Sequence, residues 1–354
     1  MSRAMWGSRA RRSDRGHAPA THADQGAQHV EGGDSSRRTA KRRRRNEVTN
    51  ELLPAGVHVL ERGWLSSNNI VIVGGSSAAV VDSGYGAHSV QTVQLVDRAR
   101  CDRPLELLVN THLHSDHCGG NAALQERFPE LHIAVPPGLA GAVREWDEAA
   151  LTYEPTGQTC PRFQHHHVLV PGASVRLGDL DWEVHAAPGH DPHSVILYER
   201  ETRTLLSADA LWENGFGVVF PELEGDIAFD DVANTLDVIE DLRPRIVVPG
   251  HGSMFADVQG ALSRARSRLA AYVREPRRHA SHAAKVLLKF KLLEWQQIDR
   301  EALHAWTEGT RYFRLVHSRF ESTSHFGSWI ERLLLELQKA EAIHIDGGRV
   351  SNRN

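Results

Sequence analysis

Short apolar runs alternate with polar turns between residues 57 and 250, and this pattern predicts strands interspersed with helices. Runs rich in Val, Ile and Leu, broken by Ser-Ser-Asn-Asn and Gly-Gly, are typical of strands joined by tight turns. Helical spacing of apolar residues predicts helices over 87–99, 138–146 and 229–242, and another begins near His117. The alternation indicates a layered α/β architecture. The predicted strands are VHVLERG, NNIVIVGG, AAVVDSG, LELLVN, HIAVP, VRLGDLDWEVHAA, SVILYER, RTLLSAD and RIVVPG.

After Phe255 the pattern changes to amphipathic helices, and strand character returns only in the last residues. Glu275-Pro276 separates the first two helices because proline cannot continue a helix, and HIDGGRV near the end is suited to a small hairpin. We therefore divide the chain near residue 256. An α/β domain is expected over 47–255 and a helical C-terminal region over 256–354, with a packing role or a role in homodimer formation. The predicted helices are residues 256–273, 281–295, 299–319 and 326–342.

Charge and composition narrow the choice of partners. Residues 1–46 carry 12 Lys and Arg against 4 Asp and Glu and few large apolar side chains, which is typical of a disordered basic tail. The remaining residues carry 29 Lys and Arg against 41 Asp and Glu, so nucleic-acid binding is disfavoured except through the tail. No run approaches the roughly 18 apolar residues of a membrane span, and no secretory signal is evident. With only three cysteines, a cytoplasmic protein without membrane contact is expected.

The segment THLHSDHCGG, residues 111–120, follows a predicted strand and precedes a predicted helix, so it forms a tight loop at a strand's carboxyl end. His112 and His114 alternate and therefore face the same side of an extended backbone, where two imidazoles can hold one ion. Asp116 and His117 follow as the chain turns and can face a second ion. Imidazole nitrogen and carboxylate oxygen are ligands that Zn²⁺ accepts. The loop therefore predicts a metal site.

Three more loops place a candidate ligand at the end of a predicted strand: His190 in APGH, Asp209 in SAD and His251 in PGHG. Glycines beside these residues let the backbone turn sharply and approach a metal closely. Because strand ends of a layered α/β fold gather at one edge, the loops can meet there. Asp82 ends another strand and is a candidate to hydrogen-bond a ligating imidazole from behind.

Together these motifs resemble the metallo-β-lactamase-fold hydrolase superfamily, since the H-x-H-x-D-H motif runs in full from His112 to His117. The resemblance covers about residues 50–255 and implies an αββα sandwich with a dinuclear metal site at its edge, residues 47–255 being the catalytic domain. The C-terminal helices resemble the winged-helix-like appendage of some members. The ligand sets implied are His112, His114 and His190 for one metal and Asp116, His117 and His251 for the other, with Asp209 bridging the two and Asp82 hydrogen-bonded to a ligating imidazole.

Within the superfamily, the ligand pattern is most similar to the glyoxalase II-like group. True β-lactamases lack the bridging Asp as a ligand, and flavodiiron proteins have Glu in place of the second His. Asp191 and Ser194 stand where glyoxalase II-like proteins usually have Thr and His, and Ala208 stands where they have Gly. The resemblance therefore implies the metal chemistry of this group rather than glyoxalase II itself.

The expected reaction is hydrolysis of a small ester, thioester or lactone. Two Zn²⁺ ions can share a bridging hydroxide that attacks the carbonyl carbon, and iron or manganese would fit the same ligands. Asp116 is the candidate catalytic residue, placed to orient the nucleophile and relay a proton to the leaving group. Residues 211–221 and 145–163 could line the substrate pocket. A nuclease or phosphodiesterase, a sulfur dioxygenase with a single iron, and a non-catalytic binding module stay open as alternatives.

Overall fold

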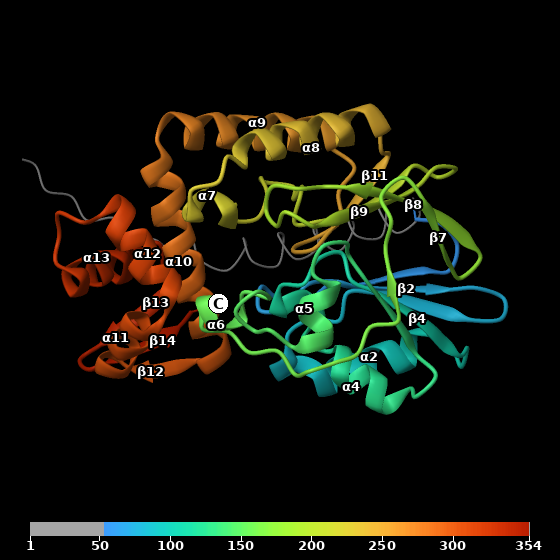
Figure 1. Cartoon of the computed structure of the whole chain (residues 1–354), viewed down its shortest axis with the longest axis horizontal. Coiled ribbons are helices and arrows are strands. Elements are labelled where there is room, and N and C mark those ends of the chain that lie inside the picture. The colour runs from blue at the N-terminus through green and yellow to red at the C-terminus, as the bar shows by residue number, and fades with distance from the viewer. Residues whose placement is uncertain (1–52, 354) are drawn as a thin grey trace, which may run out of the picture. The chain divides into compact units, whose positions relative to one another are not determined.

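Two β-sheets packed against each other form the centre of the fold (Figure 1). The computed structural model describes residues 53–353, so the predicted basic tail at residues 1–46 lies outside the described residues. In the first sheet, β1 to β3 are antiparallel neighbours and β3 to β6 are parallel neighbours. Its strands are β1 (Val57–Leu60), β2 (Asn69–Val73), β3 (Ala78–Val81), β4 (Leu105–Val109), β5 (His132–Val135) and β6 (His167–Val168), in that order.

The second sheet has the strand order β11-β10-β9-β8-β7, in which only β10 and β11 run parallel. The single strand predicted over 175–187 is wrong. Gly178 turns the chain with a φ of 55°, so this segment forms the hairpin of β7 and β8. The strands are β7 (Ser174–Leu177), β8 (Leu180–Ala186), β9 (Val195–Glu199), β10 (Thr204–Ala208) and β11 (Ile246–Pro249).

Alternating side chains explain why each sheet is covered on both faces. In β9, Val195 and Leu197 pack between the two sheets, whereas Ile196 and Tyr198 pack against the helices outside. Helices α2, α4 and α5 cover the first sheet and α8 and α9 the second, which confirms the predicted αββα sandwich (Figure 1). The larger helices of these layers are α2 (Ser89–Ala99), α4 (Asn121–Arg127), α5 (Ala140–Glu145), α8 (Phe229–Leu242) and α9 (Val258–Arg274), and the short ones are α3 (Ser115–Cys118), α6 (Tyr153–Thr156) and α7 (Phe220–Glu224).

The C-terminal helices after α9 pack around a further apolar core, which also includes Val218 and Leu223, together with a small antiparallel sheet of order β12-β14-β13. The predicted terminal hairpin is present as β13 and β14. The single helix predicted over 299–319 is wrong, because the extended backbone of Thr310 separates α11 from α12. The three-residue strand β12 was not predicted. These elements are α10 (Pro276–Trp295), β12 (Gln297–Asp299), α11 (Arg300–Gly309), α12 (Arg311–Phe320), α13 (Phe326–Lys339), β13 (Ile343–Asp346) and β14 (Arg349–Asn352).

Helix α9 follows residue 256 and packs with α8 on the second sheet, so it brings the start of the C-terminal region over the sandwich. The domain boundary itself stays a prediction. Between residues 53 and 353, none of the helices has both the length and the apolar character required to cross a membrane.

Candidate metal centre

All seven predicted ligands meet at one edge of the sandwich, in the loops that follow the strands. Their nitrogen and oxygen atoms form three overlapping groups, and within each group the atoms lie within 4.8 Å of one another. The groups share members, so the residues line one continuous site rather than separate ones. The groups are His112, His114 and His190; His112, His117 and Asp209; and Asp116, His117 and His251.

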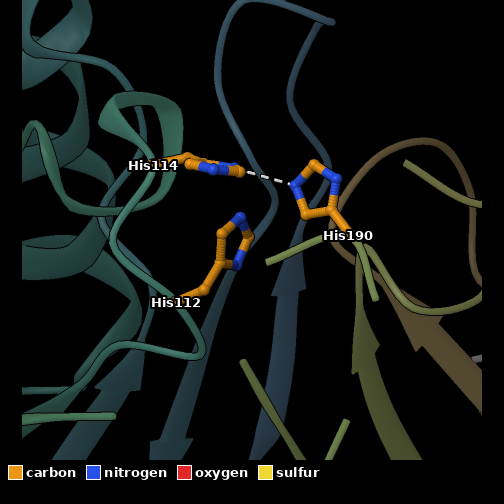
Figure 2. A group of neighbouring side chains, drawn as sticks. All are labelled: His112, His114 and His190. Carbon is orange, nitrogen blue, oxygen red and sulfur yellow. Dashed lines mark hydrogen bonds between the residues drawn. The ribbon is translucent and has the colours of Figure 1, made fainter. Parts of the chain in front are cut away.

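The first group consists of three imidazoles that point toward one another (Figure 2). His112 and His114 come from the loop after β4, and His190 comes from the loop after β8. The Nδ1 atom of His114 lies 2.8 Å from Nε2 of His190. The Nε2 atom of His112 is buried and has no hydrogen-bond partner among the described residues. A cation between the three rings would satisfy these nitrogens.

The group of Asp116, His117 and His251 lies beside the three imidazoles, and Asp209 stands between the two sets. The Nε2 atom of His251 is 3.1 Å from a carboxylate oxygen of Asp116. One oxygen of Asp209 is 3.5 Å from Nε2 of His117, and its other oxygen is 3.5 Å from Nε2 of His190. Asp209 therefore faces His117 with one oxygen and His190 with the other.

The protonation of His112 and of Asp209 suits a divalent cation. Burial, followed by the nearby His117, holds the pKa of His112 well below its ordinary value, so this ring is neutral and keeps a lone pair. Burial alone would raise the pKa of Asp209, but His251 and His117 outweigh it and hold that pKa well below the usual range. Burial would lower the pKa of His117, but Asp82 and Asp209 outweigh it and raise that pKa well above its ordinary value, so a cation at this ring would displace a proton. The Nε2 atom of His117 is also buried without a partner among the described residues. Buried imidazole nitrogens are rarely left unpaired, so the site has the features of a cation cage.

Asp82 contacts the candidate ligand His117 at Nδ1, the ring nitrogen opposite the one that faces Asp209. One of its oxygens is 2.8 Å from Nδ1 of His117, and the carboxylate also accepts from the backbone N–H and the hydroxyl of Thr111. The Thr111 hydroxyl in turn lies 3.2 Å from Nδ1 of His112. Asp82 has a φ of 56°, a left-handed conformation that is uncommon outside glycine. One carboxylate thus orients two of the imidazoles through their far nitrogens.

Gly250 allows Asp209 to approach its neighbours. A Cβ atom at this position would lie 2.3 Å from Oδ1 of Asp209 and 2.8 Å from the ring of His117. This confirms the expectation that glycine lets the chain pass close to the centre. Ala208 has a φ of 45° directly before Asp209, at a position where glycine would be relaxed.

A cavity of about 440 Å³ opens onto the centre. Trp212 and Phe220 of the predicted segment 211–221 line it, and so does Gln158 of the predicted opposite wall. The sequence did not predict that α9 and α10 complete the cavity. The residues that these two helices contribute are Arg268, His282, Val286, Leu287 and Phe290.

Among the lining residues that sequence reasoning missed, Trp64 and Arg268 show why, because nothing local indicates their position. Trp64 is 57% exposed, and its ring stacks on His251 at 5.5 Å between centroids. Its only signal is an aromatic residue in a turn between two predicted strands. Arg268 belongs to an amphipathic helix and makes no hydrogen bond or ion pair with another residue between 53 and 353. Its guanidinium lies over Gly215, where a Cβ would be 2.5 Å from a terminal nitrogen.

Comparison with known proteins gives consistent results. Residues 62–251 match the model of the family described as the Metallo-beta-lactamase superfamily. The chain is 29% identical over 226 residues to the acyl-coenzyme A thioesterase MBLAC2 of Gallus gallus, covering 56% of this chain and 77% of the relative. It is 24% identical over 190 residues to the hydroxyacylglutathione hydrolase GloC of Haemophilus influenzae, covering 50% and 81%. A solved beta-lactamase domain protein from Burkholderia ambifaria shares the fold, with a TM-score of 0.54 and 20% identity over 75% of this chain and 87% of that one.

Proposed function

Because this chain belongs to the metallo-beta-lactamase superfamily of hydrolases, we propose that it uses a dinuclear metal centre to hydrolyse a small ester, thioester or lactone. The observation that carries the proposal is the buried Nε2 atom of His112, which lacks a hydrogen-bond partner among the described residues and lies among the other candidate His and Asp ligands. Two relatives are named as a thioesterase and a hydroxyacylglutathione hydrolase, which supports a thioester among the candidate substrates.

The proposed ligand sets divide the site in two. His112, His114 and His190 would hold one ion, Asp116, His117 and His251 the other, and Asp209 would contact both. Zinc fits nitrogen and carboxylate donors best, and iron or manganese is compatible with them. When bound, the ions would supply Lewis acidity, which activates water at neutral pH and polarises the substrate's carbonyl oxygen.

Asp116 is proposed as the group that moves the proton. Its side chain lines the cavity, and a carboxylate oxygen lies 3.1 Å from Nε2 of His251. Burial would raise the pKa of Asp116, but the hydrogen bond from His251 and the charge of His117 outweigh burial and lower it. The carboxylate is therefore ionised, and it can accept a proton from the attacking water and deliver it to the leaving group.

The walls of the cavity support a small substrate with an apolar part. Val286, Leu287 and Phe290 of α10 provide an apolar face beside the centre. Arg268 adds a guanidinium that has no carboxylate partner within the described chain. An ester or thioester whose acyl part is apolar and which carries an anionic group would match both features.

The test combines metal analysis with a substrate panel. Protein purified without added metal is analysed by elemental mass spectrometry and assayed on esters, thioesters, lactones and phosphodiesters. We expect about two divalent ions per chain and hydrolysis of carbonyl substrates that is lost in His114→Ala. His185→Ala is the matched control, because His185 contacts Glu183 on β8 and none of the candidate ligands. One iron per chain without hydrolysis, or hydrolysis of phosphodiesters alone, would contradict the proposal.

A further inference from the structure

One peptide group lies between a candidate metal ligand and a histidine of the C-terminal helices. The carbonyl oxygen of Val218 is 2.5 Å from Nδ1 of His190. The next backbone N–H, that of Val219, donates to Nε2 of His279 at 3.0 Å. These two groups belong to the same peptide unit, so the contacts form a continuous chain from α10 to the edge of the metal centre.

The chemistry of this peptide fixes where the protons lie. A carbonyl oxygen only accepts, so Nδ1 of His190 must carry a proton, and its Nε2 is then free of one when the ring is neutral. Nε2 of His190 is the atom that faces Asp209 and His114. A backbone N–H only donates, so Nε2 of His279 must be unprotonated. His279 therefore acts as an acceptor in its neutral form.

The surroundings of His279 hold it in that form. The residue is 2% exposed, and its ring packs against the rings of Phe229 and Tyr272. Burial lowers the pKa of His279 to about 3, with a smaller contribution from His282. The ring therefore stays neutral at any pH near neutrality.

The loop that carries the peptide lies tightly against His190. A Cβ atom at Gly217 would fall 2.4 Å from Nδ1 of His190, so only glycine lets the backbone approach this closely. Directly after Val219, Phe220 begins α7, and its ring contacts the rings of His114 and His190. A rotation of the 218–219 peptide would therefore disturb the support of one imidazole and the packing of another.

We propose that His279 is a positioning residue for the metal ligand His190, and that it acts by fixing the Val218–Val219 peptide whose carbonyl sets the tautomer and orientation of that imidazole. Partners of this kind orient ligating histidines and increase metal affinity. The inference rests on the proposed function, because it takes His190 to be a metal ligand. It also assigns the C-terminal helices a part in building the centre.

The first test measures Zn²⁺ affinity by competition with a chromophoric chelator. His279→Leu keeps apolar volume but removes the acceptor, and it should weaken binding of at least one Zn²⁺ ion about tenfold. His279→Gln places an amide oxygen near the original Nε2 position and should restore most of the affinity. His317→Leu is the control: His317 also meets one backbone carbonyl, that of Ser324, but lies on α12 and contacts Phe326 and Trp329. It should bind Zn²⁺ like the wild type.

Unchanged Zn²⁺ affinity in His279→Leu would overturn the inference. Zn²⁺ affinity as low in His279→Gln as in His279→Leu would also overturn it, because ring packing rather than the hydrogen-bond acceptor would then matter. The second test uses ¹⁵N-histidine NMR on the metal-free full chain. In the wild type, His190 and His279 should both carry their proton on Nδ1. In His279→Leu, but not in His279→Gln or His317→Leu, His190 should lose its preference for a proton on Nδ1. If the wild type binds no metal, the proposed function fails, while the NMR spectra still decide whether His279 orients His190.

Discussion

The two sides of the candidate metal centre are supported in different ways. On one side, Nδ1 of His117 lies 2.8 Å from the charged carboxylate of Asp82, a residue of the same sheet edge. On the other side, Nδ1 of His190 meets a neutral backbone carbonyl, and that peptide is held by His279, 60 residues further along the chain. The first support comes with the sandwich itself, whereas the second depends on how α10 packs. A chain can therefore contain all seven candidate ligands and still lack the contact that orients one of them.

The largest effect is expected from Asp209→Asn, which affects both sides at once. The substitution keeps the shape of the side chain but removes the charge that faces His117 and His190. Loss of metal-ion stabilisation worth several kcal/mol should lower kcat/KM roughly a thousandfold, with metal content falling in parallel. Asp181→Asn, which breaks only an exposed pair with Arg176, should leave both unchanged. Full metal content with full activity in Asp209→Asn would remove the bridging role.

Asp82→Asn tests the charged support alone. Asparagine tolerates the left-handed backbone at this position, so the change removes charge without adding much strain. We expect Zn²⁺ affinity to fall about 10–100-fold, more than in His279→Leu, as measured by the same chelator competition. A smaller loss than in His279→Leu would reverse the ranking of the two supports.

The buried, neutral His279 should affect how the free energy of unfolding depends on pH. The pKa of His279 is about 3 in the folded protein, against an ordinary value near 6.5 in the unfolded chain. Below about pH 6.5 only the unfolded chain takes up this proton, so stability falls as the pH falls. From about pH 7.5 to pH 5 the wild type should lose about 2 kcal/mol that His279→Gln does not lose. Urea unfolding of metal-free protein checks this, and equal slopes for both proteins would contradict it.

Arg268→Gln separates substrate binding from metal binding on the helical side. If the guanidinium holds an anionic group, KM for anionic thioesters should rise about tenfold, equivalent to one charge-assisted hydrogen bond, while neutral esters and metal content stay unchanged. Arg266→Gln is the matched control, because Arg266 already pairs with Asp237 and Glu240. Equal losses on neutral and anionic substrates would mean that Arg268 acts through packing.

The smallest effect is expected at Ala208, which stabilises neither side directly. Its φ of 45° is unfavourable for a residue with a Cβ, so Ala208→Gly should raise the free energy of unfolding by about 0.5–1 kcal/mol. Thermal unfolding with and without metal measures the gain. A loss of stability would show that the turn before Asp209 is not strained.

The local sequence was sufficient to predict that the candidate ligands converge. His112 to His117 lie within six residues, and the other ligands end predicted strands, so their convergence followed from how strand ends gather in a layered fold. The β7–β8 hairpin and the break at Thr310 escaped prediction because a single glycine or one extended residue interrupts an otherwise regular pattern.

The supporting residues were harder to find. Trp64, Arg268 and His279 reach the candidate site through contacts between elements far apart in the chain. Hydrophobic periodicity carries no information about which helix face meets which loop. His279 in particular lies before the helix predicted over 281–295, whereas α10 begins at Pro276 and includes it.

The link from His190 to His279 also bears on the order of events during synthesis. All seven candidate ligands leave the ribosome before α10 does, because the last of them is His251 and the helix begins at Pro276. A nascent chain at that stage can expose a cage that is chemically complete but poorly oriented. If His279 positions His190 as proposed, the cage is oriented for its ions only once α10 has docked, so the ability to load metal would follow the folding of the C-terminal helices.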